Sequence, residues 1–154
     1  MVGAETVITA DRADSEDAVP LISELEAELA QHYPAESRHG YSVEKLLREG
    51  VAFFVARVQG RPAGCGGVQI FGTEYAELKR MYVRPEFRGR RIGKLLLDCL
   101  ATRAQEAKVG LLRLETGIHQ SSAIRLYETY GFRRRTAFAP YRDDPLSLYY
   151  EKSL

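Results

Sequence analysis

The clearest candidate for chemistry in this sequence is a basic cluster at the start of an apolar helical segment. Residues 83–95 contain two glycines, four arginines and one lysine, which are Gly89, Gly93, Arg84, Arg88, Arg90, Arg91 and Lys94. A strand ending at Val83 and a helix beginning near Gly93 would bring free backbone N–H groups and a helix dipole to one point. Since glycine lets an anion approach the backbone, the segment predicts a phosphate-binding site. The alternative is a solvated helix start in which Glu86 partners the arginines.

Two other phosphate-binding motifs are excluded by spacing. A P-loop needs four residues between its glycines and Ser or Thr after its lysine, whereas "GRRIGKL" has three residues there and Leu after the lysine. A dinucleotide fingerprint at "GCGG" is excluded because the strand-like "VQIF" follows it in place of a helix.

Strand and helix periods alternate along the chain and define the elements that would position this cluster. Strands are expected in "ETVITADR", "AFFVARV", "AGCGGVQIF", "YAELKRMYV", "GLLRLET" and "SLYYEKSL". Helices are expected around Leu21, Leu25 and Leu29, over Val43–Arg48, from Ile92 to about Lys108, and in "SSAIRLYETY". The third of these should bury Leu95, Leu96, Cys99 and Leu100. Early strands followed by a strand-helix-strand-helix-strand ending indicate an α/β or α+β domain around a mixed sheet.

Length and charge narrow the functional classes. The chain has 154 residues, 45% of them hydrophobic, and a formal net charge of +1, which fits one globular domain over 1–154. A near-neutral chain does not favour DNA or a lipid surface, and "RRR" at 133–135 is interpreted as solvated or interface charge. The apolar run "VAFFVA" is too short to span a membrane, and no signal-peptide pattern opens the sequence. We therefore predict a cytoplasmic protein with neither a nucleic-acid nor a membrane partner.

Cysteines and histidines give no sign of a metal or disulfide site. Cys65 and Cys99 lie in different expected elements, and His32, His39 and His119 are scattered. Both cysteines are predicted to be core residues without a catalytic histidine, which disfavours covalent catalysis by a cysteine nucleophile. We therefore predict no bound metal.

Two motifs between about Glu77 and Phe132 carry a family resemblance. The first, "ELKRMYVRPEFRGRRIGKLLL", is similar to the acetyl-CoA signature of the GNAT superfamily of N-acetyltransferases, with Arg88 and Gly93 at its ends and Arg91 in place of its middle glycine. "LETGIHQSSAIRLYETYGF" is similar to the next strand and helix of the family, with Gln120 where members often carry asparagine. The resemblance implies a mixed central sheet of about six to seven strands flanked by about four helices.

The resemblance also implies acetyl-CoA as cosubstrate. The loop after Val83 would hold the pyrophosphate, and the strand before it would splay from its neighbour to pair with the pantetheine amides. The implied cofactor-binding residues are Met81, Tyr82, Val83, Arg88, Gly89, Arg90, Arg91, Ile92, Gly93, Lys94, Gln120, Ala123 and Tyr127.

Three residues are candidates for catalysis. An acceptor amine must lose a proton before it attacks a thioester, and Glu77 or Glu115 could take that proton through water. The two rank equally, and a structural ion pair is the alternative for each. Strand alternation puts Glu77 on the face of Lys79, Met81 and Val83, unless a bulge of the kind found in the family breaks that parity. The family resemblance makes Tyr127 the general acid for the departing thiolate, in place of a packing role.

The acceptor pocket should lie between "HYPAESRHGY" and "FAPYRDDP". These segments supply a cationic and aromatic lining, which comprises Tyr33, Arg38, His39, Tyr41, Tyr141 and Arg142. The lining predicts a small-molecule amine acceptor that bears an anionic group, in preference to a polyamine. The alternatives are that these residues only pack the loops, and that the whole chain is a non-catalytic acyl-CoA-binding regulatory module. A homodimer is compatible with either function.

Overall fold

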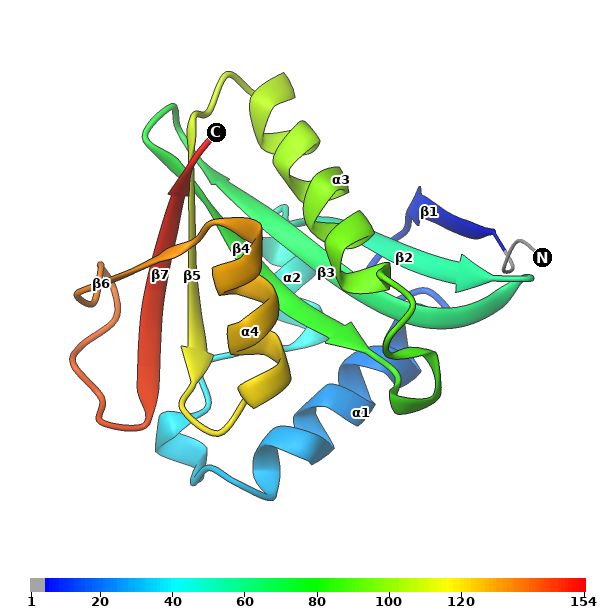
Figure 1. Ribbon diagram of the computed structural model, residues 1–154, viewed down its shortest axis with the longest axis horizontal. Helices are drawn as coiled ribbons and strands as arrows, with labels where there is room; N and C mark the ends of the chain where they lie inside the picture. Colours follow the sequence, from blue (N-terminus) through cyan, green and yellow to red (C-terminus); the bar gives the residue numbers. More distant parts are fainter. Residues whose placement is uncertain (1–4) are drawn as a thin grey trace.

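A seven-stranded sheet forms the centre of the computed structural model, which describes residues 5–154 (Figure 1). The strands are β1 (Thr6–Ala10), β2 (Ala52–Val58), β3 (Arg61–Phe71), β4 (Tyr75–Val83), β5 (Leu111–Gly117), β6 (Arg133–Arg135) and β7 (Ser147–Ser153). The helices are α1 (Ala18–Ala30), α2 (Val43–Arg48), α3 (Ile92–Glu106) and α4 (Ser121–Tyr130), with short 3-10 turns η1 (Ala35–Ser37) and η2 (Pro85–Phe87). The predicted mixed sheet of six to seven strands and about four helices is confirmed; the first four residues of the predicted domain lie outside the described part.

Helices cover the sheet on both faces. The strand order is β1-β2-β3-β4-β5-β7-β6, with β4 and β5 parallel and the other neighbours antiparallel. One core cluster packs α3 and α4 against β4 and β5, and another packs α1 and α2 against β2, β3 and β4. Figure 1 shows α3 and α4 in front of the sheet.

The sheet splits between its two parallel strands. Only Ala76 with Leu112 and Glu77 with Arg113 are paired between β4 and β5. Beyond these pairs the strands diverge, and Figure 1 shows the gap opening toward α1 and α4. The splayed strand that the resemblance implied is therefore present, and it leaves one edge of β4 without a strand partner after Glu77.

A bulge in β4 changes which side chains face α1. The pairing of β3 with β4 shifts between Cys65 and Gly67, and Arg80 has a φ of 55°. Lys79 and Arg80 therefore both point toward the α1 and α2 side, where Arg80 Nε donates to the Tyr41 carbonyl. Met81 packs on the opposite, α3 face. The bulge thus breaks simple alternation and separates Met81 from the face of Glu77.

Arginine side chains fix α1 to the sheet in addition to its buried leucines. Along α1, three glutamates each pair with an arginine outside the helix, at 2.7 to 3.1 Å, namely Glu24 with Arg84, Glu26 with Arg80 and Glu28 with Arg88. Leu21 and Leu25 are buried beneath the helix. The position of α1 therefore depends on charge as well as on apolar packing.

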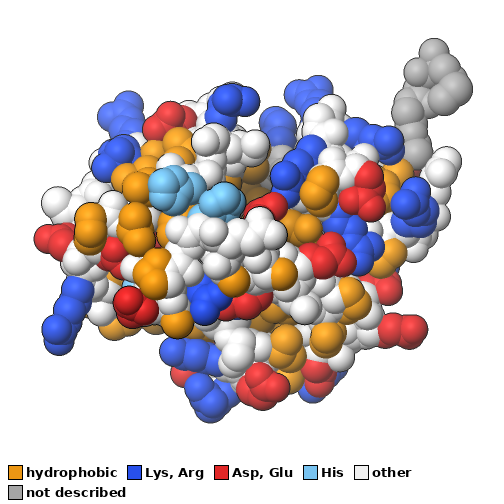
Figure 2. All heavy atoms as spheres, turned by 90° about the horizontal axis from the view of Figure 1, so that it is seen from below, with side chains coloured by type: hydrophobic (Ala, Val, Ile, Leu, Met, Phe, Trp, Pro, Cys, Tyr) orange, Lys and Arg blue, Asp and Glu red, His pale blue; other side chains and the backbone are white. Residues whose placement is uncertain are grey.

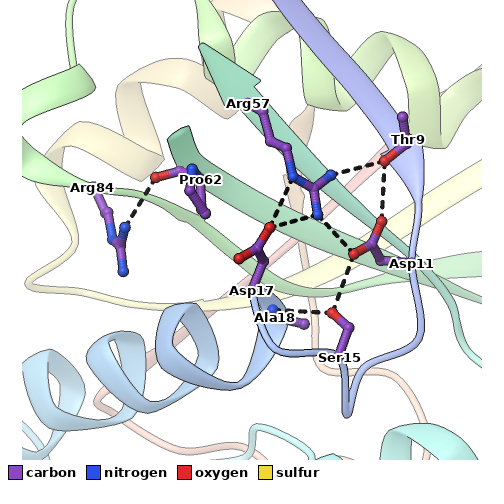
Figure 3. A network of polar contacts seen from close by, with 8 residues as sticks. All are labelled: Thr9, Asp11, Ser15, Asp17, Ala18, Arg57, Pro62 and Arg84. Carbon is purple, nitrogen blue, oxygen red and sulfur yellow. Dashed lines mark hydrogen bonds and ion pairs between the residues drawn. The ribbon is translucent and has the colours of Figure 1, made fainter. Parts of the chain in front are cut away.

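A second arginine contact fixes the loop before α1 (Figure 3). Arg57 of β2 lies between Asp11 and Asp17, with its Nη2 2.9 and 2.8 Å from their carboxylate oxygens. Ser15 Oγ accepts a hydrogen bond from the Ala18 N–H at the start of the helix and donates to Asp11. The network therefore holds the loop before α1 against β2.

The buried face of α3 differs from the predicted one. Leu97 is fully buried, whereas Leu95 is 38% exposed and Cys99 is only half-buried. The helix begins at Ile92 and presents Leu96, Leu97 and Leu100 to the sheet. The prediction of Leu95 and Cys99 as core residues was wrong because apolar type alone did not fix the rotation of the helix.

Candidate active site

Two cavities meet beside the split between β4 and β5. The larger cavity holds about 680 Å³ and the smaller about 100 Å³. Five residues from three parts of the chain line both, namely Leu25, Met81, Gln120, Ala123 and Tyr127. Occupants of the two cavities would therefore meet at these side chains.

The larger cavity is bordered by the loop between β4 and α3. Gly89 and Arg91 in this loop have φ angles of 80° and 65°. Arg91 stands where the resemblance expects a glycine, yet it adopts the left-handed conformation that glycine favours. The loop therefore leads into the first turn of α3, whose N–H groups have no partner within the helix. This backbone arrangement suits an anion.

Basic side chains gather around the larger cavity, but not all of the predicted ones line it. Arg88, Arg91 and Lys94 do, and Figure 2 shows basic side chains across a hollow from two adjacent histidines. Arg88 Nε donates to the Val83 carbonyl, and its Nη2 lies 3.1 Å from Glu28. Arg90 is exposed, with its guanidinium carbon 5.5 Å from the centre of the Phe87 ring, and does not line the cavity.

Gly93 has a packing role beside its place on the larger cavity. A Cβ at this position would lie 2.7 Å from Leu126 Cδ2 of α4. Glycine therefore allows α3 and α4 to approach each other. The sequence had indicated only that this glycine keeps the path to the backbone open for a phosphate.

The smaller cavity contains a buried ion pair. Glu77 and Lys79 of β4 have side chains 1% and 5% exposed, and Lys79 Nζ donates to Glu77 Oε2 over 2.9 Å. The Tyr141 hydroxyl donates to the same Glu77 oxygen. Glu77 Oε1 is buried and has no partner among the described residues. One carboxylate oxygen therefore remains able to accept a further hydrogen bond.

Aromatic rings support the lysine of this pair. Lys79 Nζ lies 3.9 Å from the centre of the Tyr41 ring. Burial lowers the pKa of Lys79, and the neighbouring Glu77 opposes that shift. Tyr41 itself does not line the smaller cavity and lies behind the lysine. Its contact is a cation–π interaction, which favours the charged lysine.

Glu115 lies on β5 and also lines the smaller cavity. Its Oε2 accepts a hydrogen bond of 2.8 Å from Ser147 Oγ. Burial raises the pKa of Glu115, and the negative charge of Glu77 adds to that shift. Both candidate bases are therefore at the same cavity, with different partners.

Tyr127 lies on α4 at the border of the two cavities. Its side chain is buried, and its ring meets Phe132 edge-on with centres 5.7 Å apart. Burial, with a smaller contribution from Glu115, raises the pKa of the Tyr127 hydroxyl well above its usual value. The phenol therefore stays protonated at neutral pH and can donate a proton.

The two predicted acceptor loops come together over the smaller cavity. His39 Nε2 lies 3.4 Å from Asp144 Oδ2, and the His39 and Tyr141 rings meet edge-on. The Tyr33 hydroxyl accepts from the His119 N–H and donates to Gln120. Tyr33, Arg38, His39 and Tyr141 line the cavity, whereas the side chain of Arg142 is exposed and lies outside it.

Two residues that line these cavities, Glu28 and Lys79, were not predicted as site residues. Nor were Asp144 and Ser147, which lie outside the cavities but contact His39 and Glu115. Lys79 had a detectable signal, because it lies two residues from Glu77 and so on the same face of a strand. The others make contacts between segments far apart in the chain, for which the sequence has no local signal.

The cysteines, the possible metal ligands and the helices of the described residues also bear on other functions. Cys65 is buried, and burial raises the pKa of its thiol to about 12; Cys99 has a raised pKa for the same reason. Within residues 5–154, no group of three or more His, Cys, Asp or Glu side chains is arranged to hold a metal ion. In the same range, no helix has the length and apolar character needed to cross a membrane.

Comparison with known proteins identifies the class. The acetyltransferase (GNAT) domain profile matches residues 49–134. An "IAA acetyltransferase" of Azospirillum brasilense is 45% identical over 138 residues, which cover 88% of this chain and 90% of that protein. An acyl-CoA N-acyltransferase structure from Klebsiella pneumoniae is 35% identical, with a TM-score of 0.84 and 99% of both chains covered.

A third relative was solved with its ligand. The PaiA N-acetyltransferase of Thermoplasma acidophilum, in complex with coenzyme A, is 25% identical, with a TM-score of 0.73 over 96% of this chain and 99% of that one. The chain therefore belongs to the GNAT acetyltransferase family and is an acyl-transferring enzyme.

Proposed function

We propose that this enzyme transfers the acetyl group of acetyl-CoA to the primary amine of a small molecule by direct attack. The observation that carries the proposal is the meeting of two cavities at Tyr127, with Glu77 and Glu115 on the side of the smaller one. The larger cavity would hold the cofactor, and the smaller would hold the acceptor. The coenzyme A complex of the Thermoplasma relative supports an acyl-CoA as cosubstrate.

The larger cavity suits the cofactor for physical reasons. The first turn of α3 offers unpaired N–H groups and a positive dipole to the pyrophosphate, and Arg88, Arg91 and Lys94 add charge. The open edge of β4 at Met81–Val83 offers backbone groups to the pantetheine amides. Acetyl-CoA would supply the activated acyl group.

In the smaller cavity, a carboxylate removes the proton that the attacking amine must lose. We assign this role to Glu77, because its Oε1 is buried, unpartnered and at the cavity. Glu115 is the alternative, with Oε2 already bonded to Ser147. The amine nitrogen then forms a bond to the thioester carbonyl carbon, and the carbon–sulfur bond breaks. Tyr127 donates its proton to the departing thiolate.

The proposal is tested by measuring CoA release from acetyl-CoA with a thiol reagent, across a panel of primary amines. We expect release that depends on the amine, with the acetylated amine confirmed by mass spectrometry. Tight binding of acetyl-CoA without turnover on any amine would overturn the proposal and indicate a binding module. A control that contains the enzyme and acetyl-CoA but no amine measures the background hydrolysis of the thioester.

A further inference from the structure

Two buried polar atoms in the smaller cavity have no hydrogen-bond partner among the described residues. They are Arg38 Nε, which is a donor, and Glu77 Oε1, which is an acceptor. Both residues line the cavity. A buried donor or acceptor left unpaired destabilises the folded state, and few such atoms persist in folded proteins. Their presence in one cavity indicates that an occupant supplies the missing partners.

The charges around the cavity distinguish Arg38 from its neighbours. Lys79 is paired with Glu77, Arg80 is paired with Glu26, and His39 faces Asp144. None of the ion pairs among residues 5–154 includes Arg38. Its guanidinium is therefore the cation at this cavity without a carboxylate partner, and a guanidinium fork suits a ligand carboxylate in a paired geometry.

We propose that the acceptor is a small amino acid-like molecule whose carboxylate binds Arg38 while its amine faces Glu77 Oε1. This inference rests on the proposed acetyltransferase function and adds the class of its substrate. The donor at Arg38 matches a carboxylate oxygen, and the acceptor at Glu77 matches an amine N–H. The volume of about 100 Å³ restricts the acceptor to a small molecule, and the Tyr33 and Tyr141 rings contribute apolar lining.

A polyamine fits this cavity less well. Its second ammonium group would leave Arg38 without an anion and would add a positive charge near Arg38 and Lys79. Like charges at short distance in a partly dry site repel each other. An amine that has lost its carboxylate is disfavoured as well, because the N–H group of Arg38 Nε would then stay unpaired.

The test compares acceptors that differ only at the carboxylate. The panel contains the twenty standard amino acids, and each active one is compared with its carboxamide and with its decarboxylated amine. We expect the free acids to be preferred, with a KM about 10- to 100-fold lower than for the matched neutral or decarboxylated forms.

The role of Arg38 in binding the carboxylate is tested with the variant Arg38→Gln. Arg48→Gln serves as the control because Arg48 is exposed on α2. Arg38→Gln should raise the KM for the acid about 10- to 100-fold and leave the KM for the amide unchanged. Arg38→Lys keeps the charge but lacks the guanidinium fork. Its KM for the acid should therefore lie between those of the unchanged enzyme and of Arg38→Gln. If Arg38→Gln does not fold, the lysine variant and the panel of acceptors still decide the question.

The outcomes separate this inference from the function on which it rests. Preference for polyamines or decarboxylated amines would overturn the inference and leave the acetyltransferase function standing. An equal rise of the KM for the acid and for the amide in Arg38→Gln would also overturn the inference and leave the acetyltransferase function standing. If no amine is acetylated, both proposals fail.

Discussion

The larger cavity and the smaller cavity are built in opposite ways. The larger one takes much of its wall from one continuous segment, Met81–Lys94, and uses backbone groups with exposed basic side chains. The smaller one takes buried side chains from segments far apart in the chain and contains a desolvated ion pair. Arg91 stands in a glycine position of the motif and still adopts the left-handed backbone, so the shape of the loop tolerates a change of residue. Proton transfer depends on a few buried groups, so we expect single substitutions to affect the two cavities differently.

The largest effect should come from Glu77→Gln. The amide keeps the shape of the side chain but cannot take a proton from the acceptor. We expect kcat to fall about 100- to 10,000-fold, with acetyl-CoA affinity unchanged, measured by steady-state kinetics and calorimetry.

Two controls define what that loss means. Lys79→Met removes the ion pair and keeps the carboxylate, so an equal loss in Lys79→Met would contradict a role in proton removal. Glu115→Gln tests the alternative base. If Glu115→Gln abolishes turnover and Glu77→Gln does not, Glu115 and not Glu77 removes the proton. Melting temperatures of all three variants are needed, because breaking a buried ion pair is itself destabilising.

The next effect concerns the border of the two cavities. Tyr127→Phe removes the hydroxyl and keeps the ring that packs on Phe132. Turnover should fall about 10- to 1,000-fold, while melting temperature and acetyl-CoA affinity stay the same. Full activity would make Tyr127 a packing residue and leave thiolate departure to water.

In the larger cavity, Gly93→Asp should act on cofactor binding. A carboxylate at the start of α3 would face the pyrophosphate, and we expect the Kd for acetyl-CoA to rise about 10- to 100-fold by calorimetry. The added Cβ should also lower the melting temperature, because Leu126 lies in its path. Gly93→Ala adds the Cβ without the charge, so equal affinities in the two variants would show that packing and not charge is responsible.

The smallest effect should come from Glu28→Gln. Glu28 pairs with Arg88 and lies 3.5 Å from Gln120, so its charge would compete with an anionic cofactor bound in the larger cavity for the same groups. The pair is partly exposed, so the KM for acetyl-CoA should fall only about 2- to 5-fold. Glu24→Gln, which frees Arg84 away from both cavities, should give no such gain. A rise in KM in Glu28→Gln would mean that Glu28 holds Arg88 in place for the cofactor.

The sequence predicted the fold and the larger cavity well because their signals are local. The helix Val43–Arg48 has the predicted limits, since Gly50 follows it with a φ of 66°. The loop around Gly89 is one continuous motif, so its elements could be placed before the structure was known. Arg90 was the exception, because the direction of a single exposed side chain has no sequence signal.

The smaller cavity could be predicted only in outline. The loops that carry His39 and Tyr141 were identified as its frame, but the contact of His39 with Asp144 joins residues 105 positions apart. The exposed position of Arg142 depends on the path of an irregular loop. On α3, burial of Leu97 in place of Leu95 depends on helix rotation, which tertiary packing sets.

The split between β4 and β5 places the edge of a strand inside the molecule. Exposed strand edges ordinarily invite pairing with other chains and so promote aggregation. Here the α3 and α4 face and the α1 face enclose the edge of β4, so a broad partner such as another strand is kept away (Figure 1). The gap still admits a narrow, extended molecule that has its own amide groups. The same gap can therefore accept a slender ligand and still keep this edge of β4 from pairing with another chain.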